Sequence, residues 1–268
     1  MSQRPASNPA LPRVRASLSA RIRSALYMLW LIATVAPYAI AALLLSLVTR
    51  GLPLYRFCVG WAWLALHGAR RICGIEWRLQ GLDNLPRGPA IVLVKHQSAW
   101  ETLALPLLLP RPLSYVFKRE LLWVPFFGWA LGRLDMVHID RKRGTQAFGR
   151  LQQQGARLLE RGYWIVMFPE GTRTPRGAQG HYKPGGAKLA QVTGVPVIPV
   201  AVTSARCWPR QAFVKQPGVV DVSIGPVIRT EGLGAAEINS RVQAWIESEM
   251  RRLDPDAYAE PDAATPQR

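Results

Sequence analysis

The run from Ser24 to Thr49 constrains the fold more than any other stretch, because its 26 residues carry no charged side chain. Arg23 and Arg50 bracket it. A helix rises about 1.5 Å per residue, so a run of this length could cross a hydrocarbon core of about 30 Å. Pro37 lies within the run and is expected to kink or interrupt the helix. The segment therefore belongs in or against a membrane.

A second apolar stretch, Phe57 to Ala69, is too short to span a bilayer. Its Trp61 and Trp63 suit the headgroup level. Five arginines precede the first run and four lie at or beyond its end, so a single pass would leave one basic cluster on the wrong side of the membrane. A membrane-embedded helical hairpin over residues 24–74, entering one leaflet and returning, is favoured over a single transmembrane pass. It would hold the chain at the cytoplasmic face of the inner or plasma membrane.

The charge distribution points to the same surface. Nine arginines and no carboxylate precede residue 76, so this part contributes +9 of the formal net charge of +17. Basic residues beside a membrane segment are attracted to anionic lipids by about 1 kcal/mol each. Nucleic acid is the competing partner, but the sequence holds no zinc spacing, RNP-like pattern or aromatic–basic repeat. Anionic membrane lipids are therefore the expected partner, and nucleic acid is not.

From residue 75 onward, short apolar runs alternate with helical patterns, which predicts an α/β fold with a largely parallel central sheet flanked by helices. We expect a basic disordered arm over 1–23, the membrane-anchoring hairpin over 24–74, the α/β domain over 75–253 and a mobile tail over 254–268. The expected strands are Trp77–Gln80, Ala90–Val94, Ser114–Phe117, Met136–Ile139, Trp164–Phe168, Val195–Val202 and Val220–Ile224. The expected helices of this domain are Trp100–Leu109, Glu120–Leu131, Thr145–Arg161, Gly185–Thr193 and Ala235–Arg252.

A polar turn follows the buried strand Ala90–Val94 and contains His96, with Glu101 five residues later. On one ideal helix the two side chains would stand about 140° apart. They could meet if His96 lies in the turn and Glu101 in the first turn of the next helix. In that arrangement His96 is a candidate general base, and Glu101 would fix its tautomer and stabilise the imidazolium.

A second polar turn, Phe168 to Thr174, also follows an apolar strand. Gly171 permits positive φ. Arg173 offers a planar fork suited to phosphate, and Thr172 adds a hydroxyl. If this turn and other basic residues lined a crevice at the strand ends, that crevice would bind a phosphorylated small molecule. Other cations that could line it are Lys95, Lys118, Arg141 and Lys183.

The stretch Leu121–Trp129 is too apolar for an ordinary surface helix. Packing in the core, the wall of a groove for an acyl chain, and a surface pressed against the bilayer all fit its composition.

Together these motifs resemble those of the 1-acyl-sn-glycerol-3-phosphate acyltransferases, within the wider glycerolipid acyltransferase family. The family's His-x4-Asp motif corresponds to His96–Glu101, and a block ending Gly…Arg corresponds to Gly128 through Arg141. Its Phe-Pro-Glu-Gly-Thr-Arg block is Phe168–Arg173, and its Val-Ile-Pro-Val block is Val197–Val200. The four blocks stand in the family's order between about residues 75 and 227. Two positions depart from the pattern: Glu101 replaces aspartate, and Lys95 stands where asparagine is usual.

The resemblance implies an enzyme that moves a fatty acyl group from acyl-CoA or acyl-carrier protein to the free hydroxyl of 1-acyl-glycerol 3-phosphate, a lysophospholipid, giving phosphatidic acid for phospholipid biosynthesis. His96 would deprotonate that hydroxyl. The residues implied in holding the acceptor's phosphate end are Lys118, Arg141, Glu170, Gly171, Thr172 and Arg173.

A covalent acyl-enzyme is not expected, because the sequence has no Gly-x-Ser-x-Gly elbow. Neither a cofactor nor a metal is expected, because no clustered ligand set is present. Two alternatives remain open. One is the same chemistry on another acceptor, such as glycerol 3-phosphate or a lyso-ornithine lipid. The other is a non-catalytic membrane-binding module, in which His96 would be dispensable.

Overall fold

The computed structural model describes residues 17–139 and 144–258. The strands are β1 (Ile75–Gln80), β2 (Ile91–Val94), β3 (Leu113–Lys118), β4 (Val137–Ile139), β5 (Trp164–Met167), β6 (Val197–Val202) and β7 (Gly218–Ile224). The α-helices are α1 (Leu18–Leu45), α2 (Leu52–Cys73), α3 (Trp100–Leu108), α4 (Phe127–Leu131), α5 (Gly144–Glu160), α6 (Gly185–Thr193), α7 (Ala235–Leu253) and α8 (Pro255–Tyr258). Short 3₁₀ turns include η1 (Leu82–Asn84), η2 (Arg119–Trp123) and η4 (Ser204–Arg206).

The seven strands form one sheet in the order β1-β7-β6-β2-β5-β3-β4. Every neighbouring pair among them is parallel except β6 and β7, which are antiparallel. The predicted α/β fold with a largely parallel sheet is therefore confirmed. The continuous apolar runs of the central strands follow from this topology, since a strand covered by helices on both faces has no solvent side.

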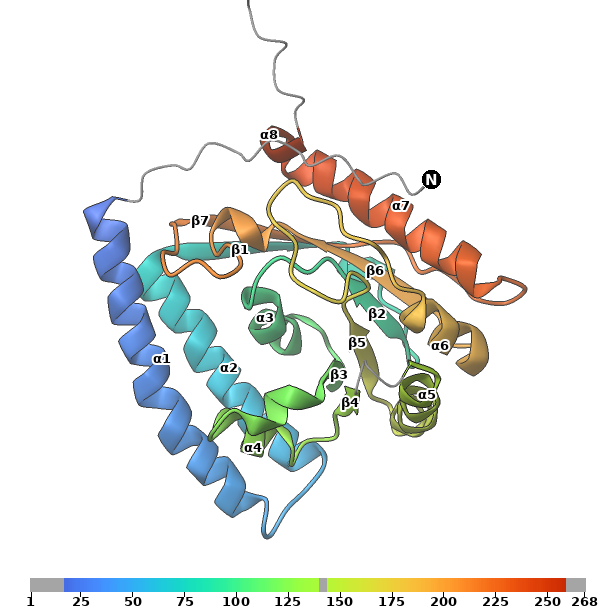
Figure 1. Cartoon of the computed structure of the whole chain (residues 1–268), viewed down its shortest axis with the longest axis horizontal. Helices are drawn as coiled ribbons and strands as arrows, with labels where there is room; N and C mark the ends of the chain where they lie inside the picture. The colour runs from blue at the N-terminus through green and yellow to red at the C-terminus, as the bar shows by residue number, and fades with distance from the viewer. Residues whose placement is uncertain (1–16, 140–143, 259–268) are drawn as a thin grey trace, which may run out of the picture.

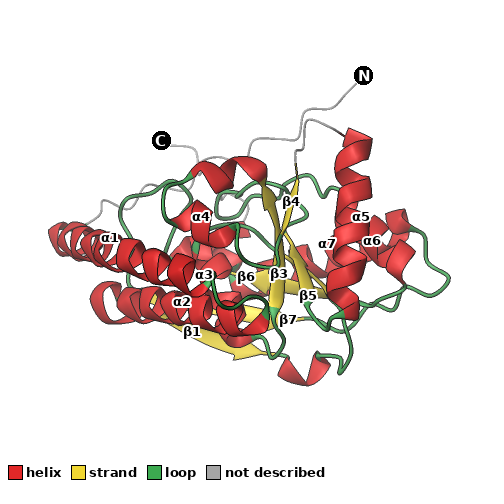
Figure 2. Cartoon of the chain, turned by 90° about the horizontal axis from the view of Figure 1, so that it is seen from below, coloured by secondary structure: helices red, strands yellow, loops and turns green. Residues whose placement is uncertain are grey.

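The two faces of the sheet belong to different cores. In β2, Val92 and Val94 pack with residues of α2 and α3 on one face, while Ile91 and Leu93 pack with α6 and α7 on the other. Figure 1 shows α5, α6 and α7 on one side of the sheet and α1 to α4 on the other. The same division is visible from below in Figure 2. The sheet is thus the middle layer of three.

Helices α1 and α2 form an antiparallel hairpin, which belongs to the layer made of α1 to α4 (Figure 1). Three side chains of α1 donate hydrogen bonds to backbone carbonyls of α2: Tyr27 to Ala65 at 3.0 Å, Trp30 to Leu64 at 3.2 Å and Tyr38 to Phe57 at 2.9 Å. Helix α1 runs through Pro37 without interruption. The helix is therefore not interrupted at this proline, and it contacts α2 on both sides of it.

Helix α1 is the one helix among the described residues that is long and apolar enough to cross a membrane, by length and composition alone. Large apolar side chains stand exposed along its outer face, including Leu18, Leu29, Ile32 and Leu44 at 74, 63, 61 and 62%. A soluble domain does not normally present such a continuous apolar face to water.

The largest differences from the expected boundaries fall at the N-terminal arm, at residues 120–131 and at the C-terminal tail. Residues 18–23, assigned to the disordered arm, are the first turns of α1, whose start is capped by Ser17. Residues 1–16 lie outside the described chain. The single helix expected over 120–131 is instead η2 followed by α4. Pro125 cannot donate the helical hydrogen bond, and Phe126 adopts a φ of 61°, so the chain turns sharply between the two pieces.

The expected mobile tail does not begin at Asp254. The Asp254 carboxylate is buried and accepts bidentate hydrogen bonds from the Arg176 guanidinium. It accepts a further hydrogen bond from Arg206 at 3.1 Å. Helix α8 follows directly and contributes the buried Ala257. Residues 259–268 lie outside the described chain.

Candidate active site

The carboxyl ends of β2, β5 and β6 meet at one edge of the sheet, because these strands are parallel and adjacent. We call it the carboxyl edge. The turn after β2 begins with Lys95 and His96, and the turn after β5 begins with Phe168. Open α/β sheets bind their ligands outside the carboxyl ends of the strands. Both polar turns singled out in the sequence are therefore neighbours.

His96 and Glu101 do meet. Glu101 is the second residue of α3, and its Oε1 lies 3.3 Å from Nδ1 of His96. The same oxygen accepts the backbone N–H of Gln97 and, at 2.8 Å, that of Ser98. The carboxylate thus reaches back over the start of its own helix, where the positive end of the helix dipole favours it. The Glu101 side chain is fully buried, whereas 14% of the His96 side chain remains exposed.

An aromatic stack supports the imidazole. The His96 ring lies 3.8 Å from the Phe168 ring, centroid to centroid, at an angle of 19°. Phe168 in turn stacks with Tyr115, whose hydroxyl donates to the carbonyl of Thr102 at 3.1 Å. With Glu101 on one nitrogen and Phe168 against its face, His96 is held in one orientation, and Nε2 is the nitrogen left for chemistry.

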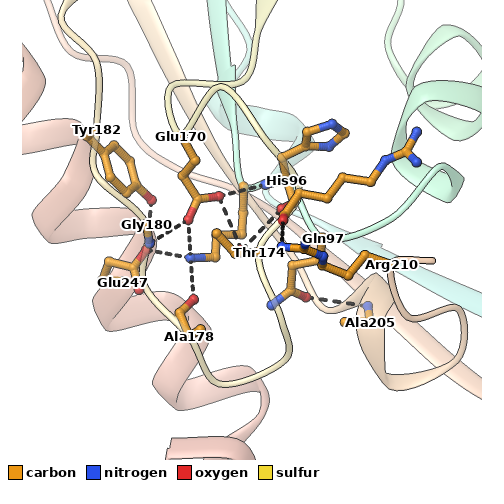
Figure 3. A network of polar contacts seen from close by, with 12 residues as sticks. His96, Gln97, Glu170, Thr174, Ala178, Gly180, Tyr182, Ala205, Arg210 and Glu247 are labelled. Carbon is orange, nitrogen blue, oxygen red and sulfur yellow. Dashed lines mark hydrogen bonds and ion pairs between the residues drawn. The ribbon is translucent and has the colours of Figure 1, made fainter. Parts of the chain in front are cut away.

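Beneath His96 lies a buried ion cluster. Nζ of Lys95 is 2.8 Å from Oε1 of Glu170 and 2.8 Å from Oε1 of Glu247, and it donates to the carbonyl of Ala178 at 3.0 Å. Tyr182 donates its hydroxyl to Glu247 at 2.8 Å. Burial raises the pKa of Tyr182, which keeps this hydroxyl protonated as a donor. Figure 3 shows Glu170 and Tyr182, both from the loop between β5 and α6, converging with Glu247 of α7 around the cluster.

The second oxygen of Glu170 reaches the turn after β2. Oε2 accepts the backbone N–H of His96 at 3.1 Å. Thr174 completes the connection, because its N–H and hydroxyl donate to the His96 carbonyl at 2.8 and 3.1 Å. The two turns are therefore bound together through the backbone of His96 itself.

The residues implied in phosphate binding occupy different places. Arg173 and Thr172 are exposed in the turn after β5, and Gly171 has a φ of 67° there. Lys118 is exposed at the carboxyl end of β3, which is separated from β2 by β5. Arg141 lies outside the described residues.

Lys95 and Glu170 differ in position from the other candidates. We expected Lys95 to line a crevice for phosphate, and this is wrong, because its side chain is fully buried between two carboxylates. Glu170 is fully buried as well, and both of its oxygens have internal partners.

Two residues that contribute to this edge, Glu247 and Arg210, were not among the residues predicted from the sequence. In the sequence, Glu247 looks like an ordinary glutamate of an amphipathic helix, and Arg210 lies in a segment that carries no motif. Only the burial of Lys95, which the structure shows, explains why an acid from a distant helix is needed here.

An apolar cavity of about 130 Å³ opens between the hairpin, α3 and α4. Phe127 of α4 lines it, while Trp123 and Trp129 nearby are exposed. Tyr115, at the end of the aromatic stack, is part of its wall, so the cavity reaches toward His96. Other lining residues are Val35, Tyr38, Ala62, Leu103 and Met136.

Comparisons with known proteins identify the family of the chain. The profile of the Acyltransferase family matches residues 76–203. A 1-acyl-sn-glycerol-3-phosphate acyltransferase of Pseudomonas aeruginosa is 40% identical over 238 residues, which cover 87% of this chain and 92% of that protein. The mouse (Mus musculus) 1-acyl-sn-glycerol-3-phosphate acyltransferase alpha is 32% identical over 173 residues, covering 63% of this chain and 60% of its own length.

The fold also has a solved counterpart. The crystal structure of the 1-acyl-sn-glycerophosphate (LPA) acyltransferase PlsC from Thermotoga maritima superposes with a TM-score of 0.71 at 23% identity, over 88% of this chain and 98% of that one. The sequence relatives and the order of the motifs lead to one family. The chain belongs to the 1-acyl-sn-glycerol-3-phosphate acyltransferases of the Acyltransferase family.

Proposed function

We propose that this enzyme transfers a fatty acyl group from an acyl thioester, acyl-CoA or acyl-carrier protein, to the free hydroxyl of 1-acyl-glycerol 3-phosphate, with His96 as general base. The observation that carries the proposal is the contact between Nδ1 of His96 and Oε1 of Glu101 at the carboxyl edge. A buried carboxylate on Nδ1 leaves the lone pair of Nε2 free to accept a proton.

The reaction then proceeds by direct attack. The acceptor hydroxyl gives its proton to Nε2 of His96 while its oxygen attacks the thioester carbonyl. The tetrahedral intermediate collapses as the carbon–sulfur bond breaks, and the thiolate leaving group takes the proton from the imidazolium. Glu101 stabilises the imidazolium that forms between the two proton transfers. Its two backbone N–H partners, at Gln97 and Ser98, keep the carboxylate fixed during the cycle.

The exposed turn after β5 would hold the phosphate of the acceptor. Arg173 presents a guanidinium that makes no hydrogen bond or ion pair within the described part of the chain, and Thr172 is exposed beside it. A guanidinium matches phosphate with two parallel hydrogen bonds. Lys118, at the end of β3, is a further candidate, and so is Arg141, which lies outside the described residues. We assign Glu170 to positioning this turn, because its oxygens are occupied inside the protein.

The apolar cavity next to Tyr115 would take an acyl chain. Its walls are carbon-rich side chains of the hairpin and of α3 and α4, and the aromatic stack leads from it to His96. The exposed apolar face of α1 would lie in the membrane, with the basic residues near both ends of the hairpin attracted to anionic headgroups. Both features suit an enzyme whose substrates are lipids.

Two variants of the full chain in detergent test the catalytic role. We expect His96→Ala to lose at least about a hundredfold in kcat, the usual contribution of a general base. His181→Ala, which removes an exposed histidine, should keep wild-type turnover. Near-normal turnover of His96→Ala would contradict the proposal.

Substrate panels test the acceptor and donor. Lysophosphatidic acid, glycerol 3-phosphate and a lyso-ornithine lipid are offered with acyl-CoA or acyl-carrier protein as donor. We expect lysophosphatidic acid to give the highest kcat/KM. A preference for an acceptor without phosphate would contradict the role of Arg173.

A further inference from the structure

Arg210 reaches the phosphate-binding turn from a segment that none of the family's motifs includes. Its Nη1 donates a hydrogen bond of 2.6 Å to the backbone carbonyl of Arg173. Arg210 belongs to the 203–217 loop, which connects β6 to β7. Figure 3 shows Arg210 beside Gln97 and Thr174, below His96.

A hydrogen bond to the Arg173 carbonyl can fix the backbone of the turn at Arg173. The peptide unit that carries this oxygen continues into the N–H of Thr174, which donates to the carbonyl of His96 at 2.8 Å. Arg210 and His96 therefore hold the two polar groups of one peptide plane. Because a peptide unit is planar, fixing both groups fixes the orientation of the backbone that carries the Arg173 side chain.

The 203–217 loop is anchored by contacts of Lys215, so it can hold Arg210 in a fixed position. Lys215 is 2% exposed, and its backbone N–H donates to Ser24 of α1 at 2.9 Å. The Lys215 ammonium lies over the rings of Trp208 and Tyr27, at 5.0 and 5.8 Å from their centroids. A cation over an aromatic ring is attracted by the ring's quadrupole, and the attraction is stronger where the site is desolvated. The loop that carries Arg210 is thus anchored to the first helix of the hairpin.

We propose that Arg210 is a positioning residue for acceptor recognition, which acts by orienting the Arg173 backbone and hence the guanidinium that meets the acceptor phosphate. The proposal rests on the phosphate role assigned to Arg173. It predicts that Arg210 matters for binding the acceptor and not for the acyl donor or the proton transfer at His96.

Steady-state kinetics of the full chain in detergent separate these effects. Arg210→Ala should raise the KM for lysophosphatidic acid about tenfold, the effect of losing one charge-assisted hydrogen bond. The KM for the acyl donor, the kcat and the thermal unfolding midpoint should stay near wild type. Arg229→Ala removes an exposed arginine after β7 and serves as the control for loss of one positive charge.

A double-mutant cycle distinguishes positioning from direct binding. If Arg210 acts through Arg173, then Arg210→Ala adds nothing to the acceptor KM of Arg173→Ala. If the two effects multiply, Arg210 contacts the phosphate itself, and the positioning role is overturned.

The remaining outcomes separate the two levels of the argument. If wild type acylates lysophosphatidic acid and Arg173→Ala is impaired, an unchanged Arg210→Ala overturns the inference alone. If wild type and Arg229→Ala do not acylate lysophosphatidic acid, the proposed function fails and the inference fails with it.

Discussion

Nζ of Lys95 lies 2.8 Å from Oε1 of Glu170, and neither side chain is exposed to solvent. Lys95 follows β2 and Glu170 follows β5, so this ion pair joins the two turns that carry His96 and Arg173. Glu247 of α7 adds a second carboxylate to the same ammonium. Buried pairs of this kind contribute little net stability when intact but cost several kcal/mol when one partner is removed. The ion pair here serves to hold the turn after β2 and the turn after β5 in fixed positions relative to each other.

Loss of the cation should therefore be costly. Lys95→Met leaves two carboxylates buried without their counter-charge, and we expect it to lower the free energy of unfolding by about 3–5 kcal/mol. Glu247→Gln keeps the pair of Lys95 with Glu170 and should cost less, about 1–3 kcal/mol. Denaturant unfolding of the full chain in detergent compares the two variants. If Lys95→Met were no less stable than Glu247→Gln, the cluster would not depend on its cation.

The charge of Glu101 is expected to matter more than its shape. Glu101→Gln keeps an oxygen that can accept the N–H groups of Gln97 and Ser98, so the turn should survive and the unfolding midpoint should change little. Without the negative charge the imidazolium is no longer stabilised, and kcat should fall about 10²–10⁴-fold with little change in KM. The pairing of wild-type stability with low kcat is the diagnostic result. Wild-type kcat in this variant would remove Glu101 from the mechanism.

The apolar cavity is expected to set which acyl chains fit. Ala62 is a buried residue of α2 on the cavity wall, and Ala62→Leu places three more carbons in that space. The preference among acyl chains should shift toward shorter ones, as measured by kcat/KM over a chain-length series. Ala236→Leu, an exposed change at the start of α7, is the matched control. An unchanged preference would show that the acyl chain lies elsewhere.

Asp254 gives a prediction about pH. Burial alone would raise the pKa of its carboxyl, but the guanidinium groups of Arg176 and Arg206 outweigh it and hold the pKa below its usual value. Such a carboxylate contributes stability that is complete above the unfolded pKa of about 3.9 and is lost as the pH falls through the folded value. Asp254→Asn should therefore cost about 2 kcal/mol at pH 7.

The difference between wild type and Asp254→Asn should shrink as the pH falls below about 4, because wild type then loses the same charge. Unfolding measured between pH 3 and 7 checks this, with the exposed Asp256→Asn as control. A difference that stays constant over this range would mean that the charge of Asp254 is not what stabilises the C-terminal end.

Much of the fold could be read from the sequence because each central strand is a continuous apolar run bounded by polar turns. All seven expected strands are present, and the helix over Gly185–Thr193 has the expected bounds. The helix expected across Pro125 is wrong because the apolar pattern of residues 121–129 serves a cavity and a surface and not a helical face. Asp254 was assigned to a mobile tail because its partners, Arg176 and Arg206, lie far away in the sequence.

The site was predictable to the extent that its residues are local. His96 and Glu101 are five residues apart, so their meeting depends on one turn. Lys95 was misplaced because its partner Glu247 lies 152 residues further along the chain, and nothing in the sequence connects the two. Arg210 depends in the same way on a long-range contact, with the Arg173 carbonyl 37 residues away. Long-range partners of single charges are what the sequence alone does not specify.

The antiparallel pairing of β6 and β7 determines where the α1–α2 hairpin joins the sheet. Strand β1 runs parallel to β7, so both strands begin at the edge where β2, β5 and β6 end. The hairpin therefore enters the sheet at Ile75 on the side of His96. If β1 ran in the opposite direction, a six-residue strand would shift the junction by about 20 Å toward the far rim of the sheet. The direction of β1 and β7 thus keeps the hairpin and the His96 imidazole at the same edge of the sheet.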